Sequence, residues 1–262
     1  MMLALAIVAT VRIGAFGLFH PVEVEVQPAR ASVLIVDAGH RQRLEGAAKL
    51  RLTSAARVTG VDGREAWFWL SVPGKIRREF HGLLDVHSDG NRLQAIVEMD
   101  PETAVASIVA AEMPRAPFEA QKAQAVVARS FLIAARGRHE GFDFCDTTHC
   151  QFLRESPPDA SPAHRAQEST RGLVLSYQGR VLTALYSADC GGRTQTLEEA
   201  GWHAEEYPYF AVECPRRGGI SGHRLGMCQA GAADLARHGK TFREILSLYF
   251  PATSLDDLVR SR

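Results

Sequence analysis

Short segments in which apolar and polar positions alternate fill the first hundred residues of the chain. Alternation begins at Val11 and recurs in VEVEV, SVLIV, AWFWLSV and LQAIVEM and around residues 50–53. A period of two with many β-branched and aromatic residues is typical of half-buried β-strands. Asp62-Gly63 and Asp89-Gly90 are turn signals between such segments. Residues 11 to about 99 are therefore predicted to be rich in β-structure.

The period changes at Asp100, where apolar residues begin to recur at helical spacing. Asp100 followed by Pro101 is typical of a helix start, and this helix is predicted to end before Pro114. A second helix is predicted between Pro117 and Gly137. GLVLSYQGRVLTALYS has the pattern of a β-hairpin, and CQAGAADLARHG and TFREILSLYF predict two short C-terminal helices. The predicted fold class is α+β, with a β-rich N-terminal part and a central helical pair.

The chain shows no low-complexity linker, so residues 11–262 are interpreted as a single domain. The first ten residues, MMLALAIVAT, are apolar and uncharged. They fit either the remnant of an export signal, without its basic start and clear cleavage site, or a first strand. Lys+Arg and Asp+Glu both number 30, so the net charge gives no support for a nucleic-acid partner.

The first predicted helix carries a carboxylate on its apolar face. Val105, Ile108 and Val109 form an apolar stripe, and Glu112 occupies the next position of that stripe. Partial burial and the negative end of the helix dipole would both favour the neutral form of this group. A carboxyl group that keeps its proton near neutral pH is a candidate general acid. The alternative is a helix-end glutamate that turns to solvent or pairs with a neighbouring cation.

Four stretches carry distinctive residue combinations: AAEMPRAPFEAQKAQAVVARS (110–130), CDTTHCQ (145–151), YSADCGGRT (186–194) and GHRLGMCQAGA (222–232). In this order they resemble motifs of the stage II sporulation protein D (SpoIID/LytB) family, over about residues 80–255. The resemblance is specific because all four stretches occur in the same order, and no single stretch would make it specific. In the last stretch Arg224 replaces the glycine usual in the family and Cys228 replaces the usual serine.

The resemblance implies a peptidoglycan lytic transglycosylase that cleaves the β-1,4 bond between N-acetylmuramic acid and N-acetylglucosamine, with Glu112 as catalytic residue. Ordinary glycosidases need two carboxyl groups. A transglycosylase uses the muramoyl C6 hydroxyl as an internal nucleophile, so one glutamate can act as acid and then as base, leaving 1,6-anhydromuramoyl ends. Glycan without stem peptides is the expected substrate. The alternative, from the LytB branch, is a non-catalytic glycan-binding module that enhances wall amidases.

Further residues are candidates for substrate contacts in a glycan-binding cleft: Lys122, Arg129, Ser187, His223, Gln229 and Trp202. The two cations share one face of the second helix and could hold the muramic acid carboxylate. The histidine and the glutamine bracket a Gly-rich turn that lets a substrate come close to the backbone. The loop tryptophan offers a flat surface for a sugar ring. Each has a structural alternative: a solvated basic stripe, a strand-end serine, an ordinary turn or a ring that caps the core.

The stretch 145–151 is a candidate metal site. Cys145, His149 and Cys150, together with His139, offer four sulfur and nitrogen ligands of the kind that tetrahedral Zn²⁺ prefers. The spacing is not that of a common zinc finger, but some SpoIID-type proteins have zinc with such ligands, which supports these positions. The alternatives are a Cys145–Cys150 disulfide and a reduced pair. Four ligands without an open position predict a structural zinc and not a catalytic one, and no other cofactor is expected.

The remaining cysteines are Cys190 and Cys214, which could pair, and Cys228, which is then the odd one and expected to be buried. The resemblance implies an exported protein of the cell envelope, either periplasmic, extracytoplasmic or membrane-tethered. Its expected partners are peptidoglycan glycan strands, wall amidases or other cell-wall remodelling proteins, and not nucleic acid.

Overall fold

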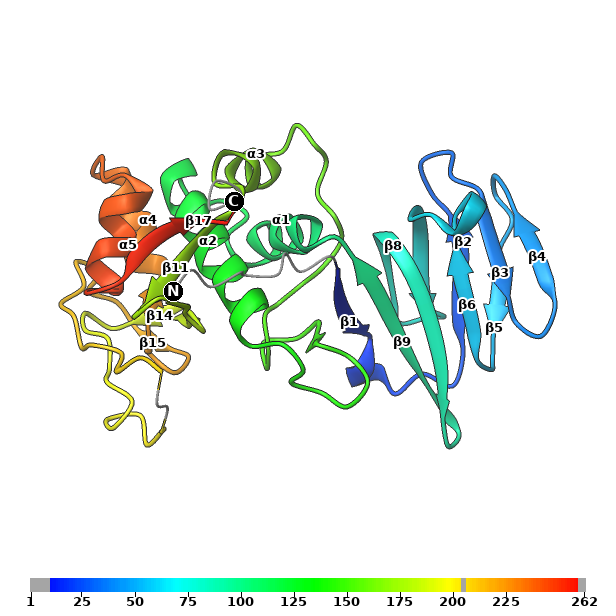
Figure 1. The fold of residues 1–262 in the computed structure, drawn as a ribbon, viewed down its shortest axis with the longest axis horizontal. Coiled ribbons are helices and arrows are strands. Elements are labelled where there is room, and N and C mark those ends of the chain that lie inside the picture. Colours follow the sequence, from blue (N-terminus) through cyan, green and yellow to red (C-terminus); the bar gives the residue numbers. More distant parts are fainter. Residues whose placement is uncertain (1–9, 204–205, 259–262) are drawn as a thin grey trace. The chain divides into compact units, whose positions relative to one another are not determined.

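The computed structural model describes residues 10–203 and 206–258. The chain divides into two compact units, and the division falls inside helix α1, between Ser107 and Ile108. We call residues 10–107 and 136–156 the β unit, and the other described residues the helical unit (Figure 1). The interpretation of 11–262 as one domain stays a prediction. The choice between an export signal and a strand for residues 1–9 lies outside the described residues.

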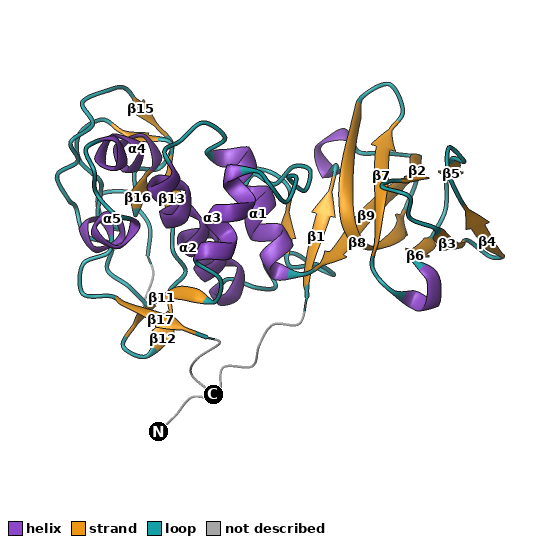
Figure 2. Cartoon of the chain, turned by 90° about the horizontal axis from the view of Figure 1, so that it is seen from above, coloured by secondary structure: helices purple, strands orange, loops and turns teal. Residues whose placement is uncertain are grey.

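The β unit consists mainly of strands, drawn in orange in Figure 2. They are β1 (Val11–Ala15), β2 (Val24–Pro28), β3 (Leu34–Asp37), β4 (Arg41–Leu44), β5 (Leu50–Leu52), β6 (Ala56–Thr59), β7 (Ala66–Val72), β8 (Ile76–Asp89), β9 (Arg92–Met99) and β10 (Phe144–Cys145). Two 3₁₀ turns accompany them, η1 (Gly17–Phe19) and η2 (Val61–Gly63).

These strands form one connected sheet in the order β10-β1-β9-β8-β6-β3-β4, with β7 joined to β8, β2 to β7 and β5 to β2. The long strand β8 links both parts, since residues 76–82 pair with β7 and residues 83–89 with β9. Gly82 stands at the changeover, where a Cβ would collide with the carbonyl oxygen of Glu98. Phe16, Phe68 and Phe80 are fully buried and pack together in the core of this unit.

The helical unit contains the last turn of α1 (Pro101–Glu112) and the helices α2 (Phe118–Ala134), α3 (Pro162–Ser169), α4 (Gln229–Arg237) and α5 (Phe242–Tyr249). Its strands are β11 (Leu173–Tyr177), β12 (Arg180–Val181), β13 (Tyr186–Ser187), β14 (Asp189–Cys190), β15 (Ile220–Ser221), β16 (Met227–Cys228) and β17 (Ser254–Asp257). They form three small sheets, β12-β11-β17, β13-β16 and β14-β15.

Helix α2 is the centre of the helical unit. Its residues from Ala120 to Leu132 are buried with one exception, and it packs against α3, α4, α5 and β11. The small side chains of the alanines at 120, 123, 125 and 128 let neighbouring elements approach the helix backbone closely on several sides. This helix therefore supports the segments that carry the candidate site.

The α+β class and the helical pair are confirmed. Asp100 caps α1 as expected, since its Oδ1 accepts hydrogen bonds from the N–H groups of Glu102 and Thr103 at 2.8 and 3.2 Å. The second arm of the hairpin is shorter than expected and ends at Val181. Helix α3 was not predicted, although Ser161 caps it and accepts from a backbone N–H at 3.1 Å. Within the described residues no helix combines the length and apolar character that a membrane crossing requires.

Candidate active site

Glu112 is the last residue of α1, and both of its carboxylate oxygens accept hydrogen bonds. Tyr186 in β13 donates from its hydroxyl to Oε1 over 3.0 Å, and Gln229 at the start of α4 donates from Nε2 to Oε2 over 3.2 Å. The same Nε2 lies 3.3 Å from Oε1 of Gln124 in α2. Groups from β13 and α4, the second also bonded to α2, therefore hold one partly buried carboxylate in a defined orientation.

Tyr186 acts as a permanent donor to this carboxylate. Burial first, then the charge of Glu112 and the hydrogen bond to it, raise the pKa of the Tyr186 hydroxyl well above its ordinary value of about 10. The phenol consequently keeps its proton at physiological pH and presents a hydrogen to Oε1. The neutral form of Glu112 expected from the sequence stays a prediction.

The parallel pairing of β13 with β16 brings both donors to Glu112. Tyr186 pairs with Met227, and Gln229 follows two residues later. Gly226 has a φ of +66°, and a Cβ at this position would collide with the carbonyl oxygen of Leu185. The Gly-rich stretch is therefore needed for a close approach between two backbone segments.

The four predicted zinc ligands converge in the β unit. Ligand atoms of His139, Cys145, His149 and Cys150 all lie within 4.8 Å of one another. His139 Nε2 is 3.2 Å from Cys150 Sγ, and His149 Nδ1 is 3.7 Å from Cys145 Sγ and 3.5 Å from Cys150 Sγ. A tetrahedron with Zn–S bonds of about 2.3 Å and Zn–N bonds of about 2.0 Å separates its ligand atoms by roughly 3.3–3.8 Å, so this set fits Zn²⁺. Both cysteines are free thiols, which does not support the disulfide alternative.

The loop that carries these ligands is fixed to its surroundings. Asp146 accepts a hydrogen bond from the Phe16 N–H over 3.2 Å and forms a largely buried ion pair with Arg78 over 2.7 Å. The ring of His139 stacks on Phe142 with the centroids 4.5 Å apart. The ligand positions are therefore set by the protein itself, as a structural metal site requires.

Comparisons with known proteins match the central part of the chain. A model of the stage II sporulation protein (SpoIID) family matches residues 89–177, which contain Glu112 and the four metal-ligand candidates. A Bacillus subtilis protein named amidase enhancer is 34% identical over 107 residues. These matches support assignment of this part of the chain to the SpoIID/LytB family. An uncharacterized protein of Brachyspira hyodysenteriae is 30% identical over 146 residues.

The match to the Brachyspira protein covers 54% of this chain, and the match to the amidase enhancer covers 40% of it. They cover 37% and 14% of the two relatives, so the chain spans a minor part of their length. Of the four sequence motifs, 110–130 and 145–151 lie inside the family match, and 186–194 and 222–232 lie beyond its end.

The structure shows the local role of the two residues, Arg224 and Cys228, that depart from the usual SpoIID/LytB motif. Arg224 has a φ of +60°, a conformation that glycine adopts more easily, which is consistent with the glycine usual at this position. Cys228 is the N-cap of α4, and its Sγ accepts a hydrogen bond from the Gly231 N–H over 3.3 Å. The thiol thereby does what a serine hydroxyl does at an N-cap.

Two of the predicted substrate contacts, Trp202 and His223, lie together. Their ring centroids are 5.3 Å apart, and the tryptophan is 46% exposed. Burial lowers the pKa of His223, and a hydrogen bond with the Tyr186 backbone opposes this only in part. Its Nδ1 accepts from the Leu225 N–H over 3.0 Å, which requires an unprotonated Nδ1. The pair therefore presents an aromatic surface beside a neutral imidazole.

The other predicted contacts differ in their surroundings. Gln229 binds Glu112 directly. Ser187 follows Tyr186 and is buried, and its hydroxyl has no hydrogen-bond partner among the described residues. Lys122 forms an ion pair with Glu119 over 2.6 Å. These placements leave the substrate roles as predictions.

Arg129 is 2% exposed and lies inside the helical unit. Its guanidinium donates to the carbonyl oxygens of Leu173, Gln167 and Ala125 over 3.0, 3.4 and 3.5 Å. These bonds tie α2 to β11 and α3. Its burial does not fit the alternative of a solvated basic stripe, and its expected role in substrate binding stays a prediction.

Sequence reasoning missed two residues of the Glu112 site, Tyr186 and Gln124. Both stood inside the motifs that carry the family resemblance, directly before a serine and within the alanine-rich run of α2. Their positions in those motifs were the available signal. Their chemistry alone was not, because a strand tyrosine is often part of the core and a helix glutamine is mostly at the surface.

Proposed function

We propose that this protein is a lytic transglycosylase that cleaves the β-1,4 bond between N-acetylmuramic acid and N-acetylglucosamine in peptidoglycan. The single observation that carries the proposal is the carboxylate of Glu112, held at both oxygens by Tyr186 and Gln229. A positioned carboxyl group with fixed orientation is what proton transfer to a glycosidic oxygen needs.

The proposed reaction uses Glu112 twice. Its protonated form gives the proton to the glycosidic oxygen, and the bond from that oxygen to C1 of muramic acid breaks. The C6 hydroxyl of the same sugar then forms a bond to C1 and loses its proton to the Glu112 carboxylate. The residue returns to its first state, and the product carries a 1,6-anhydro ring. This reaction needs one carboxyl group and not the two of ordinary glycosidases.

In this proposal the exposed ring of Trp202 stacks on a sugar, and the neutral imidazole of His223 beside it offers polar contacts. Our proposed substrate is glycan that carries no stem peptides. Because peptidoglycan lies outside the cytoplasmic membrane, we also propose that the protein acts in the cell envelope after export.

We further propose that His139, Cys145, His149 and Cys150 hold one Zn²⁺ in the β unit. A hydrogen bond from the Cys150 thiol lowers the pKa of Cys145 to about 3, so one thiolate is available before metal binds. Four protein ligands leave no coordination position for substrate or water, so the proposed ion stabilises the fold and takes no part in the reaction.

The proposal is tested by digesting purified glycan strands without stem peptides and analysing the products by mass spectrometry. Wild-type protein should release 1,6-anhydromuramoyl ends, and Glu112→Gln should release none while keeping its circular dichroism spectrum. Glu168→Gln in α3, which removes an exposed carboxylate paired with Arg171, is the matched control and should retain activity. Reducing ends without anhydro sugar would contradict the mechanism.

The amidase-enhancer relative supports a second candidate, a glycan-binding module that stimulates a wall amidase. In that case Glu112 contacts glycan or amidase and transfers no proton. Digesting glycan strands that keep their stem peptides, with and without an added wall amidase, distinguishes the two, because an amidase cleaves the bond between the stem peptide and the glycan. Stimulated amidase activity without any anhydro product, from both wild type and Glu112→Gln, would favour the enhancer.

A further inference from the structure

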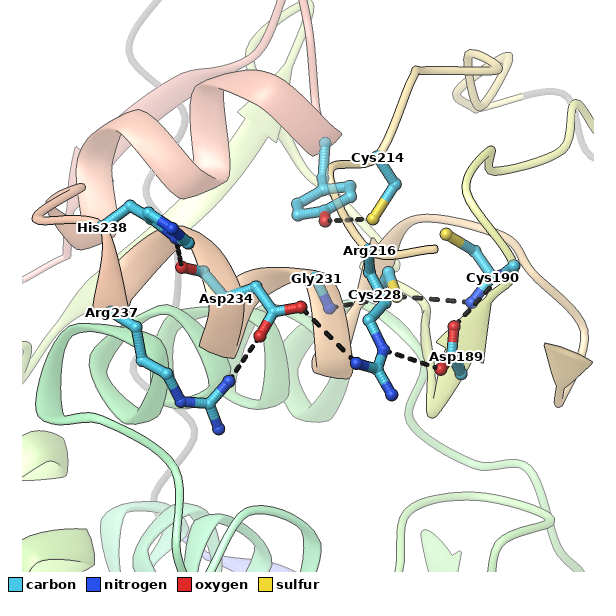
Figure 3. Close-up of polar contacts among 11 residues, drawn as sticks. Asp189, Cys190, Cys214, Arg216, Cys228, Gly231, Asp234, Arg237 and His238 are labelled. Carbon is cyan, nitrogen blue, oxygen red and sulfur yellow. Dashed lines mark hydrogen bonds and ion pairs between the residues drawn. The ribbon is translucent and has the colours of Figure 1, made fainter. Parts of the chain in front are cut away.

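Three cysteines that the sequence analysis treated as a pair and an odd one converge in the helical unit (Figure 3). The Sγ atoms of Cys190, Cys214 and Cys228 all lie within 4.8 Å of one another, and the residues are 0%, 2% and 0% exposed. All three are free thiols, so the expected Cys190–Cys214 pairing is not formed in this structure. They come from β14, from the loop between β14 and β15, and from β16.

The surroundings supply hydrogen bonds to these sulfur atoms. Backbone N–H groups of Cys190 and Gly231 both donate to Cys228 Sγ over 3.3 Å. The hydroxyl of Tyr249 lies 3.1 Å from Cys214 Sγ, within hydrogen-bond distance. Donors aimed at sulfur stabilise thiolates, the form in which cysteine binds metal.

Space at the cluster depends on a glycine. A Cβ at Gly231 would collide with the Tyr249 hydroxyl and with Cys214 Sγ. A glycine inside a helix destabilises it by about 1 kcal/mol relative to alanine. The close approach of the sulfur and hydroxyl groups explains why α4 has glycine at this position.

An ion-pair clamp holds the three cysteine-bearing segments in place. Arg216, two residues after Cys214, pairs with Asp189 over 3.2 Å and with Asp234 of α4 over 3.8 Å, and these contacts are visible in Figure 3. Asp189 directly precedes Cys190. The positive charge of Arg216 near the cluster also offsets part of the negative charge that thiolates would bring.

We propose that Cys190, Cys214 and Cys228 form a second metal site, which binds one thiophilic d10 ion, Zn²⁺ or Cu⁺, through three thiolates. A disulfide uses two sulfur atoms and gives no reason for a third to lie against them, whereas a soft ion needs three or four at one point. The ion would connect β14 to the start of α4. Tyr186 lies four residues before Cys190, and Gln229 directly follows Cys228, so the ion would fix the backbone of both donors to Glu112. The proposal does not depend on the reaction assigned to Glu112.

The test counts metal and protected thiols in the purified full chain. The three cysteines fall in three different tryptic peptides, and both cysteines of the His139 cluster fall in a fourth. Reduced protein loaded anaerobically with Zn²⁺, or separately with Cu⁺, should resist alkylation at Cys190, Cys214 and Cys228 together. Removing the ion with a chelator should make all three react at least tenfold faster. The Zn²⁺ and Cu⁺ loadings show which ion the site prefers, and protection by either supports the proposal.

Cys228→Ser is the decisive variant, because the hydroxyl can still cap α4 while one ligand is lost. It should bind one metal ion fewer per chain than wild type, and Cys190 and Cys214 should lose their protection. Cys150→Ser is the matched control and should leave protection at the three sites unchanged. Should the variants fold poorly, alkylation of the wild type with and without metal still decides. The proposal is overturned by alkylation rates that metal does not change, or by a disulfide between any two of the three in protein purified without reductant.

Discussion

Replacing Tyr186 with phenylalanine removes one hydrogen-bond donor from Glu112 and keeps the aromatic ring. The lost bond joins a phenol hydroxyl to a carboxylate over 3.0 Å. Hydrogen bonds to charged groups contribute about 1.5–3 kcal/mol. Since Glu112 is partly exposed, we expect the lower end of this range, about 1.5 kcal/mol. Because the bond orients the carboxyl group for proton transfer, its loss should slow the reaction about tenfold.

The measurement is the rate of anhydro-product release by wild type and Tyr186→Phe at saturating glycan. The rate should fall about tenfold, because the carboxyl group is less well oriented. Tyr207→Phe is the matched control, since it removes a hydroxyl that donates to the Pro251 carbonyl oxygen over 2.9 Å and does not contact Glu112. It should lower stability and leave the rate of the folded protein unchanged. A Tyr186→Phe rate equal to the wild-type rate would refute the reasoning.

Three further predictions follow from the surroundings of single groups. Arg129→Met should destabilise the protein by about 2–4 kcal/mol in urea unfolding, because buried carbonyl oxygens lose their donors. The KM of the folded fraction should stay unchanged if Arg129 has only this structural role and does not bind substrate. Folding lowers the pKa of His223, so the unfolded chain binds more protons than the folded chain below about pH 6.5. The free energy of unfolding should therefore fall as the pH drops through that range. His223→Gln should weaken this pH dependence of stability. Zn²⁺ at 1,000 times its Kd should stabilise the protein by about 4 kcal/mol for each occupied site and raise its melting temperature. Cys150→Ser should abolish the contribution of the cluster at His139.

The sequence predicted the strands in which apolar and polar residues alternate clearly. AWFWLSV is β7, residue for residue, and LQAIVEM lies within β9. The longest strand, β8, was not predicted, although its buried positions alternate from residue 80 to 86. One of these positions is Gly82, which is required by the close approach of Glu98 and not by hydrophobicity. Hydrophobic alternation is therefore lost where backbone packing sets the residue type.

The same distinction separates the cysteine sites. His139 and the cluster at 145–150 were recognised as one ligand set, because most of the ligands are adjacent in the sequence and the resemblance supported them. Cys190, Cys214 and Cys228 were divided into a pair and an odd residue, since cysteine counting favours pairs. Their convergence depends on β14, β16 and the long loop between β14 and β15, and no local pattern reports which distant segments meet.

Glu112 was found from its place on an apolar stripe, but the stripe does not explain how its carboxyl group is oriented. Tyr186 of β13 and Gln229 at the start of α4 donate to its two oxygens, and they lie 74 and 117 positions along the chain from it. Two donors from different elements fix the direction of a carboxyl group, which apolar neighbours cannot do. Hydrophobic periodicity therefore locates a candidate acid, whereas the groups that orient it are identified only when distant segments are seen together.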